Sequence, residues 1–343
     1  MTESAFRVRP AQISDLDALY ALALQTGGGF TNLPPDRVAL AQRLERSAQG
    51  FSEAGDPAAT YILVLETLDD GYVVGTATLF AKIGVEWPFY SYRRIRLSQT
   101  SVGLGKTTRS EVLHLVNDFD GCSEVGGLFL DPAWRRGRSG RLLARSRYLF
   151  IAQMRERFAD RVVADLRGYQ DEAGRSPFWD GVGRHFFDMP FDEADRLNSL
   201  TGNQFIADLM PKHPIYIQLL PPEAQQVIGR PHPAGEPAHR LLIEEGFRDD
   251  GYVDIFDAGP TVHTEIRDLK AIRDSRLATV TAIAQDPERE GLEISLISAG
   301  RCADFRATSG RLRLDDQGGC VLSPALAQAL NVQPGEMVRH VPL

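Results

Sequence analysis

Cysteine and long hydrophobic runs are both scarce in this chain of 343 residues. The three cysteines, Cys122, Cys302 and Cys320, are odd in number and far apart, which argues against a disulfide framework and against a cysteine zinc site. No apolar stretch reaches the roughly 18 residues that a membrane-spanning helix needs. The opening segment MTESAFRVRP has no apolar run typical of a secretion signal. We therefore expect a cytoplasmic protein with no membrane role.

Positive charge is also in the minority, with 38 lysine and arginine residues against 46 aspartate and glutamate residues. The formal net charge is −8 without a long run of one sign, and an acidic surface repels the phosphates of DNA and RNA. The sequence therefore predicts no nucleic-acid role, and the surface would mildly attract a cationic substrate. The simpler explanation of the same charge is that it keeps the protein soluble.

The order of expected elements mixes strands and helices. A short strand at 6–9 precedes helical stretches, a hairpin follows at 61–66 and 72–80, and a strand at 125–130 leads into a helix at 141–158. A further buried strand is expected at residues 162–166. The pattern predicts an α/β fold, more specifically an α+β mixed sheet.

The length predicts two or three domains. We expect a first domain over 1–200, and within it the segment 81–124 is too long for a simple loop and should carry structure of its own. Residues 201–284 begin with a proline-rich stretch and are expected to form a second, substrate-binding region that carries His232. Short strands and turns predict a small β-rich C-terminal domain over 285–343.

A loop rich in glycine and arginine separates the strand at 125–130 from the following helix. Free N–H groups and the positive end of the helix dipole at such a helix N-terminus form a site for phosphate or pyrophosphate. Four cationic side chains accompany the loop: Arg135, Arg136, Arg138 and Arg141. Taken alone, the pattern fits a solvated basic turn equally well.

The surrounding order resembles the acyl-CoA site of the GCN5-related N-acetyltransferase superfamily, in which a strand pairs with the pantetheine arm and the loop holds the pyrophosphate. The sequence Arg135-Arg-Gly-Arg-Ser-Gly140 matches that loop at its first and last residues, and Arg138 stands where the pattern has its first glycine. The resemblance implies a GCN5-related acyltransferase-like core with a family-specific insertion. It assigns six residues to acyl-CoA binding: Leu128, Leu130, Arg135, Ser139, Gly140 and Arg141.

Histidine is the natural candidate for the chemical step. Acyl transfer to an amine needs a base for the ammonium proton and a donor for the leaving thiolate, and histidine suits both near neutral pH. Of seven histidines, His232 in Gly-Arg-Pro-His-Pro and His213 in Pro-Lys-His-Pro lie on loops held rigid by proline. Either is also compatible with an ordinary loop histidine. The histidines show neither HExxH nor paired spacing, so we expect no metal site.

Successive blocks of the chain resemble arginine N-succinyltransferase over roughly residues 6–276. The blocks occur in the family's order: TGGGFTNLP, SEVGGLFLDPAWR, RGYQDEAGRSPFWDGVGRHFF, FIADLMPKHPIY, VIGRPHP, EEGFRDDGYVDIFDAGPT and IRDSR. The resemblance implies transfer of succinyl from succinyl-CoA, a co-substrate, to the α-amino group of L-arginine in bacterial arginine catabolism, with no permanently bound cofactor. It also implies His232 as the proton donor and Leu128 as a succinyl-CoA contact.

The resemblance leaves several alternatives open. Some members are one of two paralogous subunits and use ornithine, so the chain is expected to be a homo-oligomer or a hetero-oligomer with a paralogous subunit. It could also be a non-catalytic or weakly active subunit, or act on another amine or acyl-CoA. Candidate partners for the acceptor are the carboxylates Glu124, Asp131, Asp165 and Asp171. Candidate partners for the succinyl carboxylate are the arginines at 135–141 and Arg93, Arg94 and Arg96.

Overall fold

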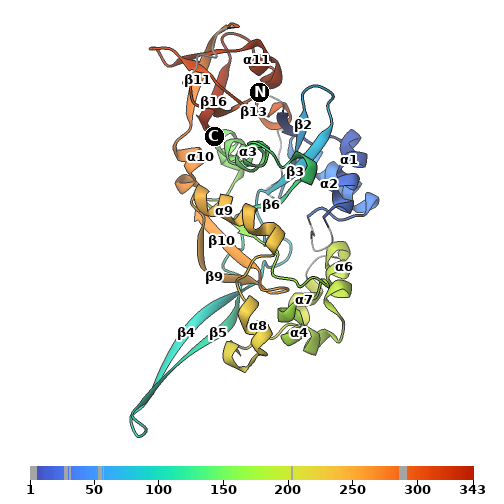
Figure 1. Cartoon of the computed structure of the whole chain (residues 1–343), viewed down its shortest axis with the longest axis vertical. Coiled ribbons are helices and arrows are strands. Elements are labelled where there is room, and N and C mark those ends of the chain that lie inside the picture. The colour runs from blue at the N-terminus through green and yellow to red at the C-terminus, as the bar shows by residue number, and fades with distance from the viewer. Residues whose placement is uncertain are drawn as a thin grey trace.

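The computed structural model describes residues 6–343 apart from 27–29, 31, 53–55, 57, 202–203 and 286–291. The three glycines of the block TGGGFTNLP therefore lie outside the described residues. Sixteen strands of the described chain form one continuous mixed sheet, which runs the length of the elongated molecule (Figure 1). Helices cover both of its faces, and the mixed α/β class predicted from the sequence is confirmed.

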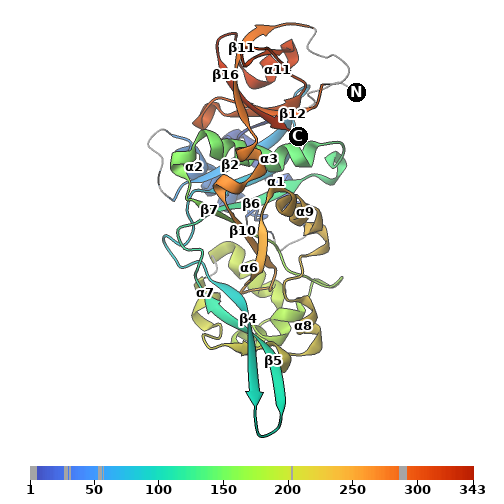
Figure 2. The same ribbon diagram turned by 90° about the vertical axis from the view of Figure 1, so that its left-hand side faces the viewer.

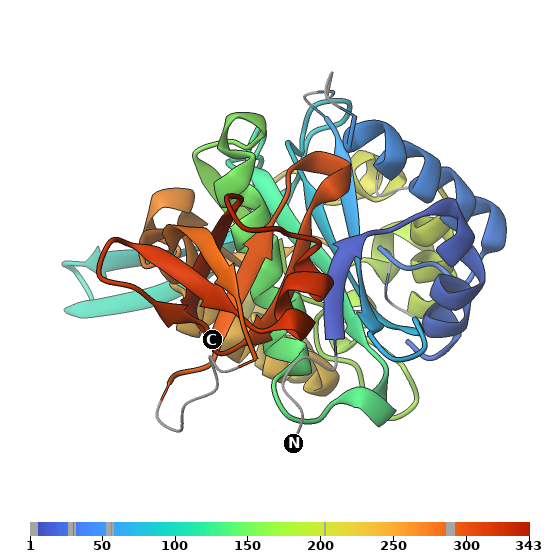
Figure 3. The same ribbon diagram turned by 90° about the horizontal axis from the view of Figure 1, so that it is seen from above.

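The first part of the sheet is antiparallel in the order β1 (Phe6–Pro10), β2 (Thr60–Thr67), β3 (Val73–Phe80) and β6 (Ser123–Leu130). Alternate residues of β2 face opposite layers, as the strand geometry requires. Ile62 and Val64 pack with α1 (Leu16–Leu24) and α2 (Arg37–Gly50), whereas Leu63 and Leu65 pack with α3 (Ser139–Gln153). Figure 3 shows α1 and α2 to one side of these strands. Burial on both faces explains why this strand reads as a continuous apolar run.

The middle of the sheet continues through β7 (Arg161–Asp165), β10 (Pro260–Glu265), β9 (Arg248–Asp254), β4 (Ser91–Ser101), β5 (Lys106–Val116) and β8 (Ile215–Tyr216). A second apolar core, which includes Trp179 and Phe256, lies under this part. The helices of this core are α4 (Pro177–Gly181), α5 (Arg184–Phe187), α6 (Phe191–Thr201), α7 (Gln204–Leu209) and α8 (Pro222–Val227). Two further helices, α9 (Glu236–Glu245) and α10 (Lys270–Arg273), pack instead on the first core, which also contains residues of α3.

The C-terminal part contains β11 (Arg276–Ile283), β12 (Ser295–Ala299), β13 (Arg306–Gly310), β14 (Arg313–Leu314), β15 (Gly319–Leu322), α11 (Pro324–Leu330) and β16 (Met337–Pro342). It has its own apolar core, and it joins the rest of the sheet where β13 pairs with β1 at Ala307 and Val8. The β-rich composition of this tail follows the pattern read from the sequence.

The strands expected at 6–9, 61–66, 72–80, 125–130 and 162–166 are all present, with their ends within two residues of those expected. The helix expected over 141–158 is shorter, because α3 ends at Gln153 and a 3₁₀ turn follows at Arg155–Arg157. Met154 and Phe158 remain buried in the same core as α3. The apolar periodicity therefore continued past the point where the helix ends.

The segment 81–124 contains β4 and β5, which form a hairpin that projects from the body as a long arm (Figures 1 and 2). All eleven residues of each strand pair with the other strand, from Ser91 with Val116 to Ser101 with Lys106. Only the base of the arm meets other strands of the described chain, through β9 and β8. We refer to residues 91–116 as the arm.

Candidate active site

Two parallel strands part at the centre of the sheet. β6 and β7 pair only at Ser123 with Val162 and at Glu124 with Val163, and beyond Glu124 they separate. A bulge in β6 helps to turn it away, because its pairing with β3 shifts register between Thr76 and Thr78. Gly127 lies in that bulge with φ +56°, and a Cβ there would lie 2.6 Å from Thr78 Oγ1. The backbone therefore requires glycine at this point.

A cavity of about 630 Å³ opens where the strands part. Its walls come from β6, β7, one face of α3, the start of α9 and the loop before α9. The six residues expected to bind acyl-CoA all line this cavity: Leu128, Leu130, Arg135, Ser139, Gly140 and Arg141. The residues that the superfamily resemblance assigned to acyl-CoA binding therefore line a single cavity, from β6 on one side and the start of α3 on the other.

The glycine–arginine loop lines one end of the cavity and leads into α3. Ser139 lies in the first turn of the helix, and its hydroxyl donates to the backbone oxygens of Trp134 and Arg136 at 2.8 and 2.9 Å. Arg135 Nε donates to the Leu130 oxygen at 2.9 Å, which ties the loop to the end of β6. Gly140 has open space on its Cα side, where an added Cβ would meet only Leu130 Cδ2 at 3.8 Å.

The arginine at position 138 does not distort this loop. Arg138 is the N-cap of α3 with φ −113° and ψ 9°, a conformation open to any residue. The left-handed position is its neighbour Gly137, with φ +61°. The departure from the superfamily pattern at Arg138 therefore carries no backbone strain.

His232 lines the same cavity from the opposite wall. Its backbone N–H donates to the Arg167 oxygen at 2.8 Å, and Pro231 forms a bridge with Gly168, so the loop is fixed to the chain just after β7. Its ring nitrogen Nδ1 accepts the N–H of Ala234 at 3.1 Å. Burial and the nearby Arg167 guanidinium lower the pKa of His232. His213, the other proline-flanked candidate, is exposed and does not line the cavity.

Buried carboxyl groups gather where β6 and β7 part. Glu124 is 9% exposed, and burial raises its pKa to about 7. Its Oε1 lies 3.2 Å from the place a Cβ of Gly126 would take, so the carboxyl group approaches a residue of the cavity wall. Asp165 on β7 lines the cavity, accepts the Thr261 hydroxyl and has a raised pKa, through burial first and then the charges of Asp254 and Glu124.

Other predicted charges have local partners. Asp131 accepts the Ala133 N–H at 2.8 Å, and Asp171 accepts the N–H groups of Ala173 and Arg175, so both carboxylates hold turns. The three arginines proposed for the succinyl carboxylate at 93, 94 and 96 lie on the arm, away from the cavity lining.

Sequence reasoning missed Arg147 and Arg167, which also line the cavity. Arg147 lies four residues after Leu143 and three before Phe150, at the spacing of the buried face of α3. A charged residue on the apolar stripe of this helix could therefore have indicated Arg147 as a candidate functional residue. Arg167 follows β7 and donates to Gln170, and no local pattern distinguished it.

The described residues also show how far the chain meets the requirements of disulfides, metal sites and membrane-spanning helices. The three cysteines are free. No cluster of three or more histidine, cysteine or acidic side chains within the described ranges could hold a metal ion. No helix in those ranges is both long and apolar enough to cross a membrane.

Comparison with known proteins gives full-length matches. The family model for the arginine N-succinyltransferase beta subunit matches residues 6–271, and that for its C-terminal domain matches residues 276–342. Proteins named arginine N-succinyltransferase from Yersinia pseudotuberculosis (strain YPIII) and Citrobacter koseri are 40% and 42% identical, with 98% of this chain and 97% of each relative covered. Arginine/ornithine succinyltransferase subunit AI from Pseudomonas aeruginosa superposes with a TM-score of 0.90 at 35% identity over 99% of both chains.

Proposed function

The chain belongs to the arginine N-succinyltransferase family, and we propose that it transfers the succinyl group of succinyl-CoA to the α-amino group of L-arginine. It is an acyl-CoA-dependent N-acyltransferase. The observation that carries the substrate assignment is the single cavity between β6 and β7, which brings the expected donor-binding residues together with His232. In this proposal residues 1–200 supply the donor site, residues 201–284 supply His232, and residues 285–343 form the small β-rich domain.

The donor lies along β6 in this proposal. Past Glu124, β6 has no strand on its β7 side among the described residues, so its edge can pair with the amide groups of a pantetheine arm. The pyrophosphate would lie at the N-terminus of α3, where the N–H groups of Ser139 and Gly140 and the helix dipole favour an anion. This arrangement supports acyl-CoA entering from the loop end with its thioester toward Gly126.

The acceptor enters from the side of the buried carboxyl groups. Arginine carries two cationic groups and a carboxylate, and the buried carboxyl groups of Glu124 and Asp165, whose pKa values are raised, offer hydrogen-bond partners to a cationic group where the strands part. A carboxyl group with a pKa of about 7 is suited to take a proton from an ammonium group near neutral pH. We therefore assign Glu124 as the base that releases the neutral amine.

The bond changes then follow in order. The neutral amine attacks the thioester carbon, the tetrahedral intermediate collapses, and the carbon–sulfur bond breaks. His232 bears its ring proton at Nε2 because Nδ1 accepts from Ala234. That Nε2–H donates a hydrogen bond to the sulfur as it gains charge, and the second proton of the amine completes the thiol of CoA.

Thiol release from succinyl-CoA by the purified chain, with and without arginine, tests the proposal. We expect arginine to stimulate thiol release, and mass spectrometry should identify the product as N-succinylarginine. A panel with ornithine, other amines and acetyl-CoA measures specificity. If arginine stimulates no release, the chain is instead a weakly active or non-catalytic subunit, although the intact His232 loop argues against that alternative.

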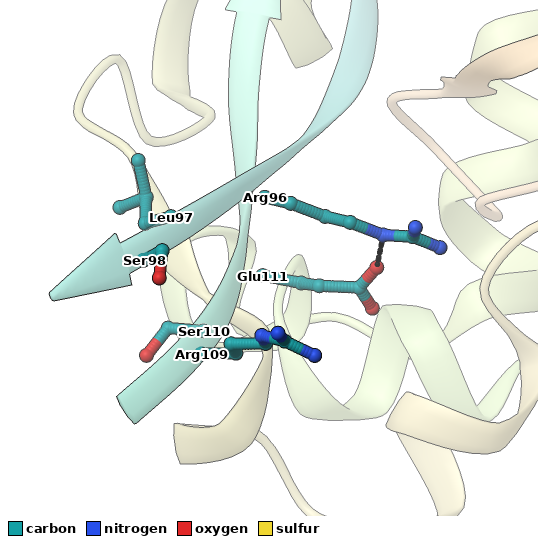
Figure 4. Close-up of a pocket in the computed structure, with 6 residues that line it drawn as sticks. All are labelled: Arg96, Leu97, Ser98, Arg109, Ser110 and Glu111. Atoms are coloured by element: carbon teal, nitrogen blue, oxygen red, sulfur yellow. Dashed lines mark hydrogen bonds and ion pairs between the residues drawn. The ribbon is translucent and has the colours of Figure 1, made fainter. Parts of the chain in front are cut away.

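We also propose that the chain works as an oligomer of identical copies joined through the arm. The arm carries five basic residues and one acidic residue, whereas the rest of the chain carries 33 basic and 45 acidic residues. Figure 4 shows Arg96, Arg109 and Glu111 on one face of the arm, with Arg96 bonded to Glu111. A basic ribbon that leaves an acidic body is complementary to the body of a second copy. Pairing with a paralogous subunit is the competing outcome.

The three free cysteines support a cytoplasmic location for this enzyme, which we propose on that ground.

A further inference from the structure

A buried arginine on α3 has no carboxylate partner in the part of the chain that the structure describes. Arg147 is 2% exposed, and within the described ranges no ion pair involves it. Its Nε donates to the Ala144 oxygen at 3.0 Å, one of its terminal nitrogens lies 3.4 Å from the Gly126 oxygen, and its guanidinium carbon lies 5.8 Å from the centre of the Tyr148 ring. A buried charge without a counterion is costly, which predicts an anion that binds beside it.

Two neighbouring arginines on α3 that also line the cavity do have carboxylate partners. Arg141 pairs with Glu244 at 2.9 Å, and Arg145 pairs with Glu245 at 3.0 Å. Arg167 donates to Gln170 and lies near the charges of Asp195 and Asp257. Arg147 is therefore the buried cation of this wall whose charge is left for a ligand.

Its place along the cavity matches the acyl end of the donor. The pyrophosphate loop ends at Gly140, and seven residues of α-helix carry α3 about 10 Å further to Arg147. On the facing strand, four residues from Leu130 to Gly126 span about 13 Å. Arg147 contacts the Gly126 end, so it lies beside the tail of the acyl group rather than beside the phosphates.

We propose that Arg147 binds the terminal carboxylate of the donor's acyl chain and so selects a dicarboxylic acyl-CoA over a neutral one. This role rests on the proposed function and names the residue that makes the donor succinyl rather than acetyl or butyryl. A guanidinium fork binds a carboxylate through two parallel hydrogen bonds. The contact to Gly126 is long, so that terminal nitrogen can turn to the ligand at little cost.

The charges of the cavity are consistent with this assignment. Arg147 is positively charged and attracts the succinyl carboxylate, whereas burial raises the pKa values of Glu124 and Asp165 and so favours their neutral forms.

The test compares two donors that differ in one group. Succinyl-CoA and butyryl-CoA have acyl chains of equal length, and only the first ends in a carboxylate. In Arg147→Met, the kcat/KM for succinyl-CoA with arginine should fall at least about 100-fold, since a buried charge contact is lost, while that for butyryl-CoA should hold or rise. For Arg147→Lys, the kcat/KM for succinyl-CoA should lie between those of wild type and Arg147→Met, because lysine keeps the charge but lacks the two-pronged guanidinium group. Arg145→Met, on the same helix, should leave the ratio of the two donors unchanged.

The outcomes separate the two claims. An equal loss with both donors in a variant that melts like wild type would show that Arg147 only supports the fold, and it would overturn this role. If Arg147→Met does not fold, Arg147→Lys gives the same comparison of donors. A wild-type chain that releases no thiol from succinyl-CoA overturns the proposed function itself.

Discussion

The ring nitrogen Nδ1 of His232 accepts the backbone N–H of Ala234 at 3.1 Å. This contact fixes the neutral ring with its proton at Nε2, since Nδ1 must keep its lone pair. Burial and Arg167 lower the pKa of the ring, which keeps it neutral near pH 7. In the proposed mechanism His232 is therefore a hydrogen-bond donor to the leaving sulfur, and another group acts as the base.

Removal of the His232 side chain should slow the chemical step. We expect His232→Ala to lower kcat by about 10²–10⁴ with little change in the KM for arginine, because the lost contact forms as the thiolate leaves. Steady-state kinetics with succinyl-CoA measure this. His213→Ala is the matched control, since His213 is also flanked by proline but is exposed, and it should behave as wild type. A His232 variant near wild-type rate contradicts the role.

Glu124→Gln should stabilise the fold and inactivate the enzyme. The pKa of Glu124 is about 7 in the fold, above its ordinary value of 4.5. A raised carboxyl pKa favours the folded state below the unfolded pKa, and this contribution is lost as pH rises from about 4.5 through 7. Wild type should therefore lose up to about 3 kcal/mol relative to the variant over that range.

Thermal melting from pH 5 to pH 8 measures this difference, which should grow with pH and level off above about 7.5. In the same range the wild-type kcat/KM for arginine should fall as pH drops below about 7, because the base becomes protonated. Equal melting of the two proteins at pH 8 would contradict the burial of a titrating carboxyl group. An active Glu124→Gln variant would remove Glu124 as the base.

The phosphate loop can be tested without disturbing the fold. Gly140→Ala places a methyl group in open space 3.8 Å from Leu130, inside the proposed pyrophosphate site. We expect the KM for succinyl-CoA to rise about tenfold, an effect near 1.4 kcal/mol, with the KM for arginine unchanged. Arg138→Gly should have little effect, since position 138 does not need a left-handed conformation. A larger effect at 138 than at 140 would contradict this description of the loop.

The residues proposed to bind the donor come from the resemblance and from one local unit of the chain, whereas long-range pairing decides the rest of the candidate site. Leu128, Ser139 and Gly140 belong to one strand–loop–helix unit, so their proximity follows from adjacent sequence. The approach of Glu124 to Asp165 depends on the pairing of β6 with β7, which no local spacing encodes.

The position of His232 beside Arg167 likewise comes from the Gly168–Pro231 bridge. The resemblance to the family named His232, but residue patterns alone did not distinguish it from His213. Arg147 could have been noticed as a charge on an apolar stripe, yet its lack of a carboxylate partner is visible only in three dimensions.

The arm projects from the body as a hairpin of β4 and β5 (Figure 1). Its outer half is a two-stranded ribbon, and such a ribbon alone is at best marginally stable in water. The tip exposes Val102 by 92% and Leu104 by 80%, so a second copy that covers it would bury apolar surface. We expect Val102→Asp with Leu104→Asp to shift the chain toward monomer in analytical ultracentrifugation, whereas Val38→Asp, at an exposed site on α2, should not. A wild-type chain that is monomeric alone and associates only with a paralogous subunit would replace self-association with hetero-association through the arm.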